Sequence, residues 1–347
     1  MAILGVEASI SGRNRFGWWL SGFTDAEGTF SITKYQGKPR KDGTRCPSGY
    51  SFEFSIQVRN DDLEILEQIK DYLKVGGLLF ASRGTSRNNG RVNDKDQVSF
   101  KVRDFASIID TIIPHFDKFP LLSKKNKDYQ IFKEAAFAHK AYLDNGGGFR
   151  KWGNTTHASI IEDYRLRLNG GRQEYFNTGI LYKSPYLDLV NKEQFSAWFA
   201  GFVDGDGCFG GYLGKGDNPS IGFKFILQLR EDDAAILSSV QSRIGCGHIR
   251  DKGVGKNATT NTKPKKSYEI TSAEDCHTYL LPIFREFVLR AKKYRDCLLF
   301  DEAVSLLVKA QSLRKNKYTE CRTLEEKSGR QYIRGLVTKL KLIKEYV

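Results

Sequence analysis

Two acidic residues in equivalent surroundings are the strongest candidates for chemistry. Glu27 precedes the last glycine of residues 20–28, and Asp206 takes the same place in residues 199–207. We expect each segment to form a helix, whose C-terminal end already carries partial negative charge, so two carboxylates brought together there need a cation. Carboxylate oxygens suit Mg²⁺, and divalent ions beside a phosphodiester can activate water and stabilise the leaving oxygen. The pair therefore predicts metal-assisted phosphodiester hydrolysis.

Small residues in the same segments indicate how the two carboxylates could meet. Gly22 and Ala26 are four residues apart, and so are Gly201 and Gly205. Residues at this spacing share one helix face, and small side chains there let two helices approach closely. The spacing predicts that the two helices cross at a pseudo-twofold seam, although a tight crossing does not by itself imply activity.

A second acid lies two residues before each candidate, at Asp25 and Asp204. On a helix this spacing directs the side chain toward a different face from that of the candidate acid. We expect these two acids to make structural hydrogen bonds rather than to bind metal.

The chain contains an internal duplication, so the same set of helices and strands is expected around each acid. Three pairs of segments match in the same order and at nearly constant spacing: 20–28 with 199–207, 57–62 with 228–233, and 114–128 with 282–296. Three ordered matches are strong evidence of a repeat, whereas a single match is weak. We predict two equivalent halves at residues 1–143 and 191–347, the second with a helical tail, and a linker or surface insertion at residues 144–190.

Each half has the pattern of an α-β-β-α-β-β-α unit. A helix is expected to start near Asn14 and near Asn191, where asparagine can cap free backbone N–H groups. Apolar residues then alternate with mostly polar ones, which indicates strands with one buried face. The alternating apolar residues are Phe52, Phe54, Ile56, Val58, Val98, Phe100 and Val102 in the first half, and Phe223, Phe225, Leu227 and Leu229 in the second. The predicted fold class is α+β, a tandem duplication that forms a pseudo-twofold pseudo-dimer.

The charge balance narrows the class of partner. The 347 residues include 55 Lys and Arg against 41 Asp and Glu, a formal charge of +14. Such an excess points to nucleic acid, an anionic membrane surface or another polyanion. No apolar run is long enough for a membrane helix, and the first residues do not read as a secretory signal. The six cysteines include no C-x-x-C pair, which fits a reducing compartment.

Residues 20–28 and 199–207 resemble the two copies of the LAGLIDADG motif in monomeric homing endonucleases. The resemblance extends over nearly the whole chain, because two motif helices, two α-β-β-α-β-β-α halves and one linker occur in order. It implies a monomer that binds a long double-stranded DNA site under a saddle of β-strands. It also implies cleavage of both strands with Mg²⁺, for which Mn²⁺ or Ca²⁺ can substitute in binding. Thr24 and Leu20-Ser21 depart from the common motif but do not include the acids.

The resemblance assigns roles to residues around the two motifs. It makes Glu27 and Asp206 the catalytic, metal-binding acids, and it makes the backbone carbonyls of Ala26 and Gly205 secondary metal ligands. These four positions form the predicted metal site.

Further residues are expected near the scissile phosphates. The resemblance places a polar residue at the end of a strand, matched by Asn60 and Glu231. It also places a lysine before the last helix of each half, matched by Lys124 and Lys292. A cation there would stabilise developing negative charge. Lysines follow immediately at residues 125 and 293, so the register is open by one residue, and a solvated basic helix start is the simpler alternative.

The polar faces of the predicted strands are candidates for reading DNA. Arginine and glutamine can pair bidentately with guanine and adenine, and a two-stranded ribbon fits the major groove. The candidates on the strands are Gln57, Arg59, Lys101 and Arg103 in the first half, and Lys224, Gln228 and Arg230 in the second. Basic loops could hold phosphates at the ends of the site, with Lys38, Arg40, Lys41, Arg45, Lys263, Lys265 and Lys266. If each half covers about one turn of DNA, the site spans roughly two turns.

Two alternatives keep the same fold without cutting DNA. A catalytically inactive DNA-binding protein or an intron RNA maturase would need the positive charge but neither acid. The presence of both Glu27 and Asp206 favours an endonuclease. The resemblance further implies an intron-encoded protein of an organelle, the mitochondrion.

Overall fold

The computed structural model describes residues 12–37, 39, 44, 48–81, 97–148, 156–215, 220–254, 264–315, 329 and 331–339. The chain forms two compact units. The first unit is Phe16–Val190, and the second unit is Asn191–Val347 together with the N-terminal residues through Arg15.

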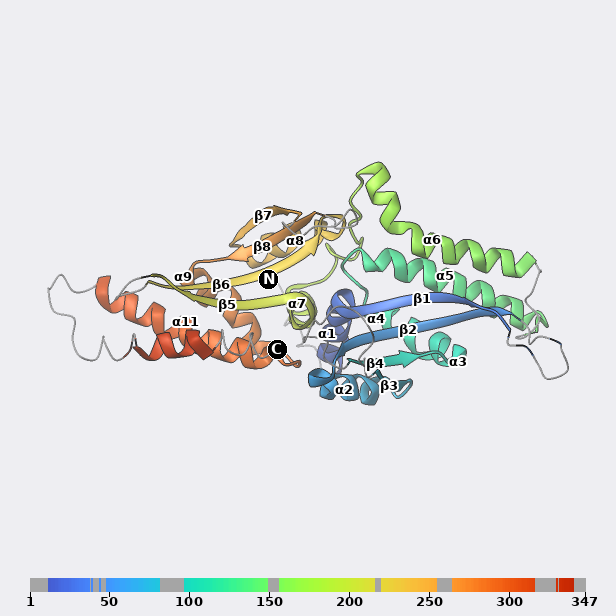
Figure 1. Ribbon diagram of the computed structural model, residues 1–347, viewed down its shortest axis with the longest axis horizontal. Coiled ribbons are helices and arrows are strands. Elements are labelled where there is room, and N and C mark those ends of the chain that lie inside the picture. The colour runs from blue at the N-terminus through green and yellow to red at the C-terminus, as the bar shows by residue number, and fades with distance from the viewer. Residues whose placement is uncertain are drawn as a thin grey trace, which may run out of the picture. The chain divides into compact units, whose positions relative to one another are not determined.

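The first unit contains one sheet and the helices that cover it (Figure 1). A motif helix leads directly into a hairpin, and after a 3₁₀ turn and a helix a second hairpin follows. In chain order the elements are α1 Gly12–Glu27, β1 Gly28–Tyr35, β2 Gly49–Arg59, η1 Asn60–Asp62, α2 Leu63–Leu73, β3 Gly77–Ala81, β4 Gln97–Val102, α3 Phe105–Ser107, η2 Ile108–Ile112, α4 Ile113–Lys118, α5 Lys125–Asp144 and α6 Thr156–Thr178.

The second unit repeats this order. Its elements are α7 Lys192–Asp206, β5 Gly207–Leu213, β6 Ile221–Arg230, η3 Glu231–Asp233, α8 Ala235–Ile244, β7 His248–Gly253, β8 Lys265–Ile270, α9 Ala273–Asp275, η4 Cys276–Leu280, α10 Leu281–Glu286 and α11 Lys293–Lys315. Residues 331–339 are also helical, whereas residues 340–347 of the expected C-terminal helix lie outside the described residues.

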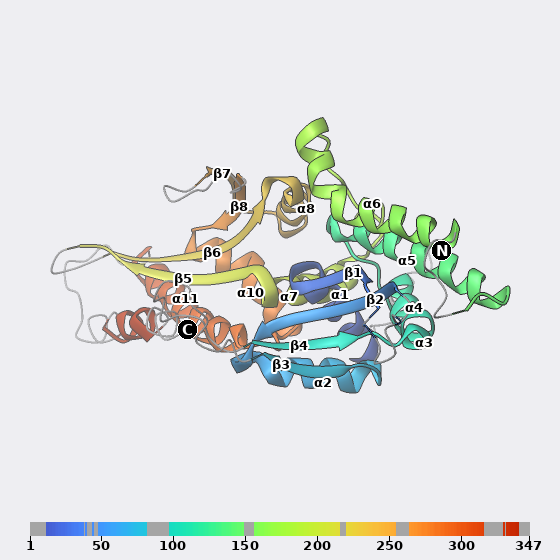
Figure 2. The same ribbon diagram turned by 45° about the vertical axis from the view of Figure 1, so that its right-hand side comes forward.

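Both sheets have the same topology. The strand order is β1-β2-β4-β3 in the first unit and β5-β6-β8-β7 in the second, and every pair of neighbours is antiparallel. Figure 2 shows the long β1–β2 and β5–β6 hairpins that follow the two motif helices. The predicted α+β fold and the predicted tandem repeat are confirmed.

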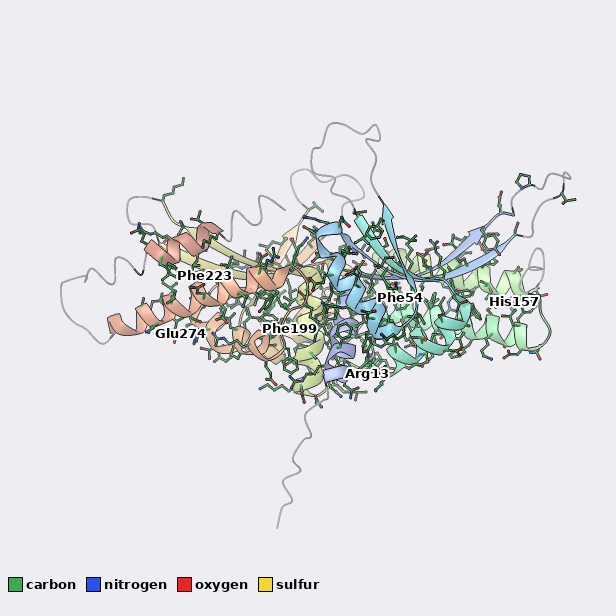
Figure 3. All side chains as sticks on the ribbon, turned by 90° about the horizontal axis from the view of Figure 1, so that it is seen from below. Arg13, Phe54, His157, Phe199, Phe223 and Glu274 are labelled. Atoms are coloured by element: carbon green, nitrogen blue, oxygen red, sulfur yellow. The ribbon has the colours of Figure 1, made fainter. Side chains whose placement is uncertain are left out.

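Most of the alternating apolar residues of the strands are buried against the helices, as their period of two predicted. Phe54 and Phe100 in the first unit and Phe225 in the second are fully buried against the helices. Phe54 and Phe199, labelled in Figure 3, lie in the core of the first and second unit respectively. Burial of an aromatic side chain of this size stabilises a fold by roughly 2–3 kcal/mol. The alternation therefore fixes which face of each sheet packs and which face is left for other contacts.

The two motif helices start differently. Asn191 caps α7, because its side chain accepts from the backbone N–H of Gln194 and the Gln194 side chain accepts from the backbone N–H of Asn191. The predicted cap at Asn14 was wrong, because α1 already includes Gly12 and Arg13. Asn14 therefore lies inside the first turn, where its backbone is helical and a cap residue's is not.

The segment between the halves contains a helix that its sequence pattern did not predict. Helix α6 runs antiparallel beside α5 and contacts the edge strand β1 (Figures 1 and 2). Glu162 on α6 accepts a hydrogen bond of 2.7 Å from the Tyr50 hydroxyl and pairs with Arg165 at 2.6 Å. Ile161 and His157 are buried, and the other described side chains of α6 are exposed or half-exposed, so a few contacts hold this helix.

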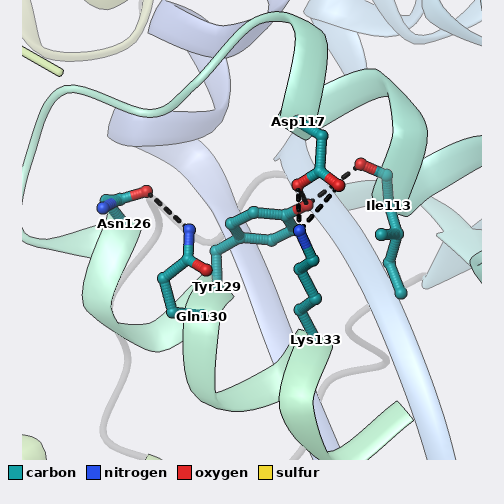
Figure 4. Close-up of polar contacts among 6 residues, drawn as sticks. All are labelled: Ile113, Asp117, Asn126, Tyr129, Gln130 and Lys133. Carbon is teal, nitrogen blue, oxygen red and sulfur yellow. Dashed lines mark hydrogen bonds and ion pairs between the residues drawn. The ribbon is translucent and has the colours of Figure 1, made fainter. Parts of the chain in front are cut away.

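A polar cluster around the buried Tyr129 fixes the start of α5 against α4 (Figure 4). The Tyr129 hydroxyl shares its hydrogen between the Asp117 carboxylate at 2.6 Å and the Ile113 carbonyl oxygen at 2.9 Å. The Lys133 ammonium pairs with the same carboxylate at 2.6 Å. The phenol, whose ring is buried, thus has both an acceptor and a charged partner, which removes the cost of burying it unpaired.

Candidate active site and DNA-reading sheets

Each motif helix changes into a strand without an intervening loop. Glu27 ends α1 and Gly28 begins β1, while Asp206 ends α7 and Gly207 begins β5. A Cβ atom on Gly28 would lie 2.5 Å from the Thr24 side chain and 2.8 Å from its carbonyl oxygen. Glycine is therefore required by the close approach, and a Cβ on Gly207 would meet its own helix in the same way. The turn leaves Glu27 and Asp206 half-exposed.

The preceding acids anchor the motif helices. The buried Asp25 carboxylate accepts from the backbone N–H groups of Leu122 at 2.8 Å and Ser123 at 3.2 Å, and from the Ser123 hydroxyl at 2.6 Å. The buried Asp204 carboxylate accepts from the N–H groups of Arg290 at 2.7 Å and Ala291 at 3.2 Å. The predicted structural role of both acids is confirmed, and each one ties its motif helix to the segment that leads into α5 or α11.

These anchors bring a lysine to the end of each motif helix. The Lys125 ammonium donates to the carbonyl oxygens of Thr24 at 2.9 Å and Ala26 at 3.4 Å. The Lys293 ammonium donates to the carbonyl oxygen of Gly205. The last carbonyls of a helix have no intrahelical partner, and a cation there also meets the negative end of the helix dipole. Each lysine therefore reaches a residue directly adjacent to a candidate acid.

The lysines predicted at the site lie one residue earlier. Lys124 precedes α5 and Lys292 precedes α11, and both are half-buried. The contacts to the motif carbonyls are made instead by the adjoining Lys125 and Lys293, a choice of register that the sequence had left open. A shift of one residue in the start of α5 or α11 decides which ammonium group faces the motif helix.

The polar residues predicted at the strand ends begin the two 3₁₀ turns. Asn60 is exposed at the start of η1, and Glu231 is half-exposed at the start of η3. The residue before each is an arginine, Arg59 or Arg230, and this arginine pairs with the acid that lies two positions after it. The Arg59–Asp61 distance is 2.5 Å and the Arg230–Asp232 distance is 2.7 Å.

The candidate DNA-reading residues share the polar face of each sheet. The register pairs Gln57 with Ser99 and Gln228 with Ser267, so equivalent glutamines project from equivalent positions, and both are exposed. Arg103 is exposed just after β4, and Lys265 is exposed at the start of β8. The predicted loop residues Lys38, Arg40, Lys41, Arg45 and Lys263 lie outside the described residues, whereas Lys266 pairs with Asp251 at 3.2 Å.

A carboxylate holds several of these cations on each sheet. Glu53 pairs with Lys101 at 3.0 Å and with Arg103. Burial raises the pKa of Glu53, but hydrogen bonds from Arg103 and Lys101 more than offset this and lower the pKa below its ordinary value.

Glu269 has the same role on the second sheet with more partners. It pairs with Lys224 at 3.0 Å, Lys252 at 2.7 Å and Arg250 at 3.6 Å, and it accepts from the Ser267 hydroxyl at 2.8 Å. Burial raises the pKa of Glu269, and hydrogen bonds from Lys252, Lys224 and Ser267 outweigh this and lower the pKa to about 2. Both carboxylates are therefore anionic at neutral pH.

The donor atoms at the motif ends fit a hard divalent cation. Each end offers one half-exposed carboxylate and a backbone carbonyl next to it, at Glu27 with Ala26 and at Asp206 with Gly205. Oxygen donors of this kind suit Mg²⁺ and Ca²⁺. The ammonium groups that already lie on the carbonyl oxygens of Ala26 and Gly205 show that these ends attract positive charge.

The repeated fold, the acidic helix ends and the basic sheet faces occur in both units, as a two-repeat family requires. The chain belongs to the LAGLIDADG endonuclease family, whose sequence pattern matches residues 20–136 and 199–304. The predicted family resemblance is confirmed. Within the described part of the chain, no helix is long and apolar enough to cross a bilayer.

Individual relatives extend the comparison. "Probable intron-encoded endonuclease 2" of Neurospora crassa is 25% identical over 310 residues, which cover 85% of this chain and 61% of the relative. The chain thus spans less than two thirds of the length of that relative. The solved structure of I-SmaMI bound to an uncleaved DNA target with calcium ions has a TM-score of 0.66 at 23% identity, covering 93% of this chain and 97% of the other. I-LtrWI bound to its target DNA has a TM-score of 0.68 at 19% identity, covering 94% and 98%. These two likenesses show the fold.

Sequence reasoning missed the carboxylates beneath the candidate DNA-reading residues. Glu53 and Glu269 lie among polar strand residues, and in the sequence they look like ordinary outward-facing charges. The sequence did hold a signal, because two basic residues lie two positions apart on, or just beyond, a strand that pairs with the strand of each acid. Only the register places Glu53 diagonally opposite Lys101, and Lys224 diagonally opposite Glu269.

Proposed function

We propose that this chain is a site-specific double-stranded DNA endonuclease that hydrolyses both strands with Mg²⁺. The observation that carries the proposal is the repeated helix end, where Glu27 and Asp206 each follow a carbonyl that accepts from a lysine. Family membership and the basic sheet faces support it. Divalent ions held by such carboxylates would activate water and stabilise the leaving oxygen of a phosphodiester.

The residues of the chain itself have separable roles in this proposal. Glu27 and Asp206 hold the cations, with the carbonyls of Ala26 and Gly205 as secondary ligands. Lys125 and Lys293 keep positive charge beside the acids, where it would stabilise charge developing on a scissile phosphate. Lys124, Lys292, Asn60 and Glu231 remain proposed members of the same site, positioned by the residues adjacent to them.

The polar sheet faces would bind the DNA. Gln57 and Gln228 are exposed at equivalent positions and can read base edges in the major groove. Lys101, Arg103, Lys224, Arg230 and Lys265 add positive charge, so binding should weaken steeply with added salt as counterions are released. If each sheet covers about one turn, the site is roughly two turns long.

The first experiment identifies the target and the activity together. The purified chain is incubated with a randomised duplex library, with Mg²⁺ in one arm and Ca²⁺ in the other. We expect defined sequences to be cut on both strands in Mg²⁺, and the same sequences to be bound but uncut in Ca²⁺. Binding without cleavage in Mg²⁺, or preferential binding of structured RNA, would instead support the inactive DNA-binding protein or the maturase.

The second experiment tests the two acids. Glu27→Gln and Asp206→Asn should each reduce cleavage at least about a thousandfold, because a required metal carboxylate is lost, while target affinity stays within a few fold. Asp144→Asn is the matched control, because Asp144 also ends a helix but lies outside the motif, and it should cut normally. Loss of DNA binding in the Glu27 or Asp206 variant would make the acids structural.

We also propose that the chain is a monomer encoded by an organellar, mitochondrial intron. The proposal is supported by the intron-encoded names of its relatives. Two repeats in one chain already provide both acids, so a second copy is not needed to complete the site. Sedimentation of the chain alone and with a target duplex should give one protein copy in each case.

A further inference from the structure

The two sheets carry the same diagonal ion pair with its charges exchanged. Phe54 pairs with Val102 in the first sheet, and Phe225 pairs with Ile270 in the second, so these four residues define equivalent positions. The residues before Phe54 and Phe225 are Glu53 and Lys224. The residues before Val102 and Ile270 are Lys101 and Glu269.

The geometry of the pair is the same in both sheets. Lys101 lies 3.0 Å from Glu53, and Lys224 lies 3.0 Å from Glu269. The acid is on β2 in the first sheet, but it is on β8, the counterpart of β4, in the second. An ion pair has therefore been kept at one site of the fold while its acid and base have changed strands.

The acids are more covered than the bases. The Glu269 side chain is 3% exposed, whereas Lys224, Arg250 and Lys252 are 30%, 57% and 37% exposed. In the first sheet the Glu53 side chain is 14% exposed and Arg103 is 57% exposed. Each carboxylate thus lies beneath its cations, which remain accessible to a ligand above the sheet.

We propose that Glu53 and Glu269 are positioning residues for DNA specificity, which fix the reading cations on different strands in the two sheets. The inference rests on the proposed function. A lysine or arginine tethered by a carboxylate is held in one rotamer, so it meets a particular base edge with less loss of freedom. An untethered cation moves toward the nearest phosphate instead, where it adds affinity without sequence information.

The exchange of charges has a consequence for the target. In the first sheet Glu53 tethers cations at and just beyond the end of β4. In the second sheet Glu269 tethers cations on β6 and β7. Tethered cations on different strands reach different base steps of a groove, so the two half-sites should differ in sequence at the steps that these cations read.

The test compares Glu53→Gln and Glu269→Gln with the unmodified chain in the Ca²⁺ selection. We expect each variant to lose about tenfold in base discrimination over one or two steps of its own half-site, since a good base contact is worth roughly 1–3 kcal/mol. Affinity for an unrelated duplex should rise, and the slope of log K against log salt should steepen by roughly one, because a negative charge near the phosphates is removed. Glu274→Gln removes an exposed acid of the second unit and should change neither measurement.

A charge-exchange variant separates positioning from folding. The double substitution Glu53→Lys with Lys101→Glu keeps an ion pair in the first sheet but gives it the strand order of the second. We expect thermal stability to stay near that of the parent, while base preference changes in the first half-site and remains unchanged in the other.

The outcomes are distinct. If the parent selects a sequence and the glutamine variants keep the same base preferences, the positioning role is overturned and the proposed function stands. If the charge-exchange variant is stable and also keeps the parental preferences, the link between strand and half-site is overturned. If the parent selects no sequence at all, both the proposed function and this inference fail.

Discussion

The two units have the same contacts around the motif helices, but they differ in their sheet faces and in their buried histidines. Asp25 and Asp204 anchor the motif helices in the same way, and Lys125 and Lys293 lie on equivalent carbonyl oxygens. The acid of the ion pair lies on β2 in the first sheet and on β8 in the second. The first unit also contains three buried histidines. They are His115, His139 and His157. The contacts around the two candidate acids are therefore the same in both units, whereas the exposed sheet faces, which we propose to read two different half-sites, have diverged.

The largest expected difference between the units is their response to acid. Burial lowers the pKa of His115 to about 3 and that of His139 to about 4, with smaller contributions from Lys118 and His157 respectively. Such histidines are neutral in the folded state but bind protons below pH 6.5 when unfolded, so their contribution to stability is present above pH 6.5 and falls as the pH drops. Between pH 6.5 and 5 the loss is about 2 kcal/mol for each.

Region-resolved hydrogen exchange at pH 7 and pH 5 measures this effect. We expect protection in α5 to fall on the order of 30-fold or more after correction for intrinsic rates, while α11 changes little. The described histidines of the second unit, His248 and His277, are exposed or half-exposed and serve as the internal control. In a double variant His139→Leu and His157→Leu the loss should become smaller. Equal loss of protection in both units would contradict the assignment.

The anchoring acids should be of equal importance in the two units. Asp25→Asn or Asp204→Asn replaces a buried anionic acceptor with an amide whose NH₂ group faces backbone donors, so each should lower the free energy of unfolding by about 2–3 kcal/mol. Urea unfolding followed by circular dichroism measures it, with Asp144→Asn as the exposed control. A change below about 0.5 kcal/mol in either variant would show that the anchor is not shared, because surface substitutions fall in that range.

The smallest predicted contrast concerns the arginines at the strand ends. The Asp232 side chain is fully buried beside Arg230, whereas Asp61 is 41% exposed beside Arg59. Asp232→Asn should therefore lower the free energy of unfolding by about 1–2 kcal/mol, and Asp61→Asn by no more than about 0.5 kcal/mol. Urea titration of the two single variants gives the comparison directly. A larger effect at Asp61 would mean that exposure does not decide the strength of the pair.

The strands and the repeat could be predicted because their signal is local. Phe54 and Phe100 alternate with polar residues, and that alternation alone fixes the buried face. Helix starts were less certain, since capping at Asn191 was correct and capping at Asn14 was not. Helix α6 was missed because a helix that buries only a narrow stripe has little periodicity in its apolar residues.

The sequence by itself determined the duplication, the fold class, the family and the two candidate acids, because each depends on residue types at short and regular spacing. The tertiary structure alone decided which lysine lies on the motif carbonyls, what Asp25 and Asp204 hold, and which carboxylate lies beneath which cations. These are contacts between residues about 50 to 100 positions apart or on neighbouring strands. Their partners are set by strand register and by where a helix begins, and a shift of one residue in either changes the partner completely.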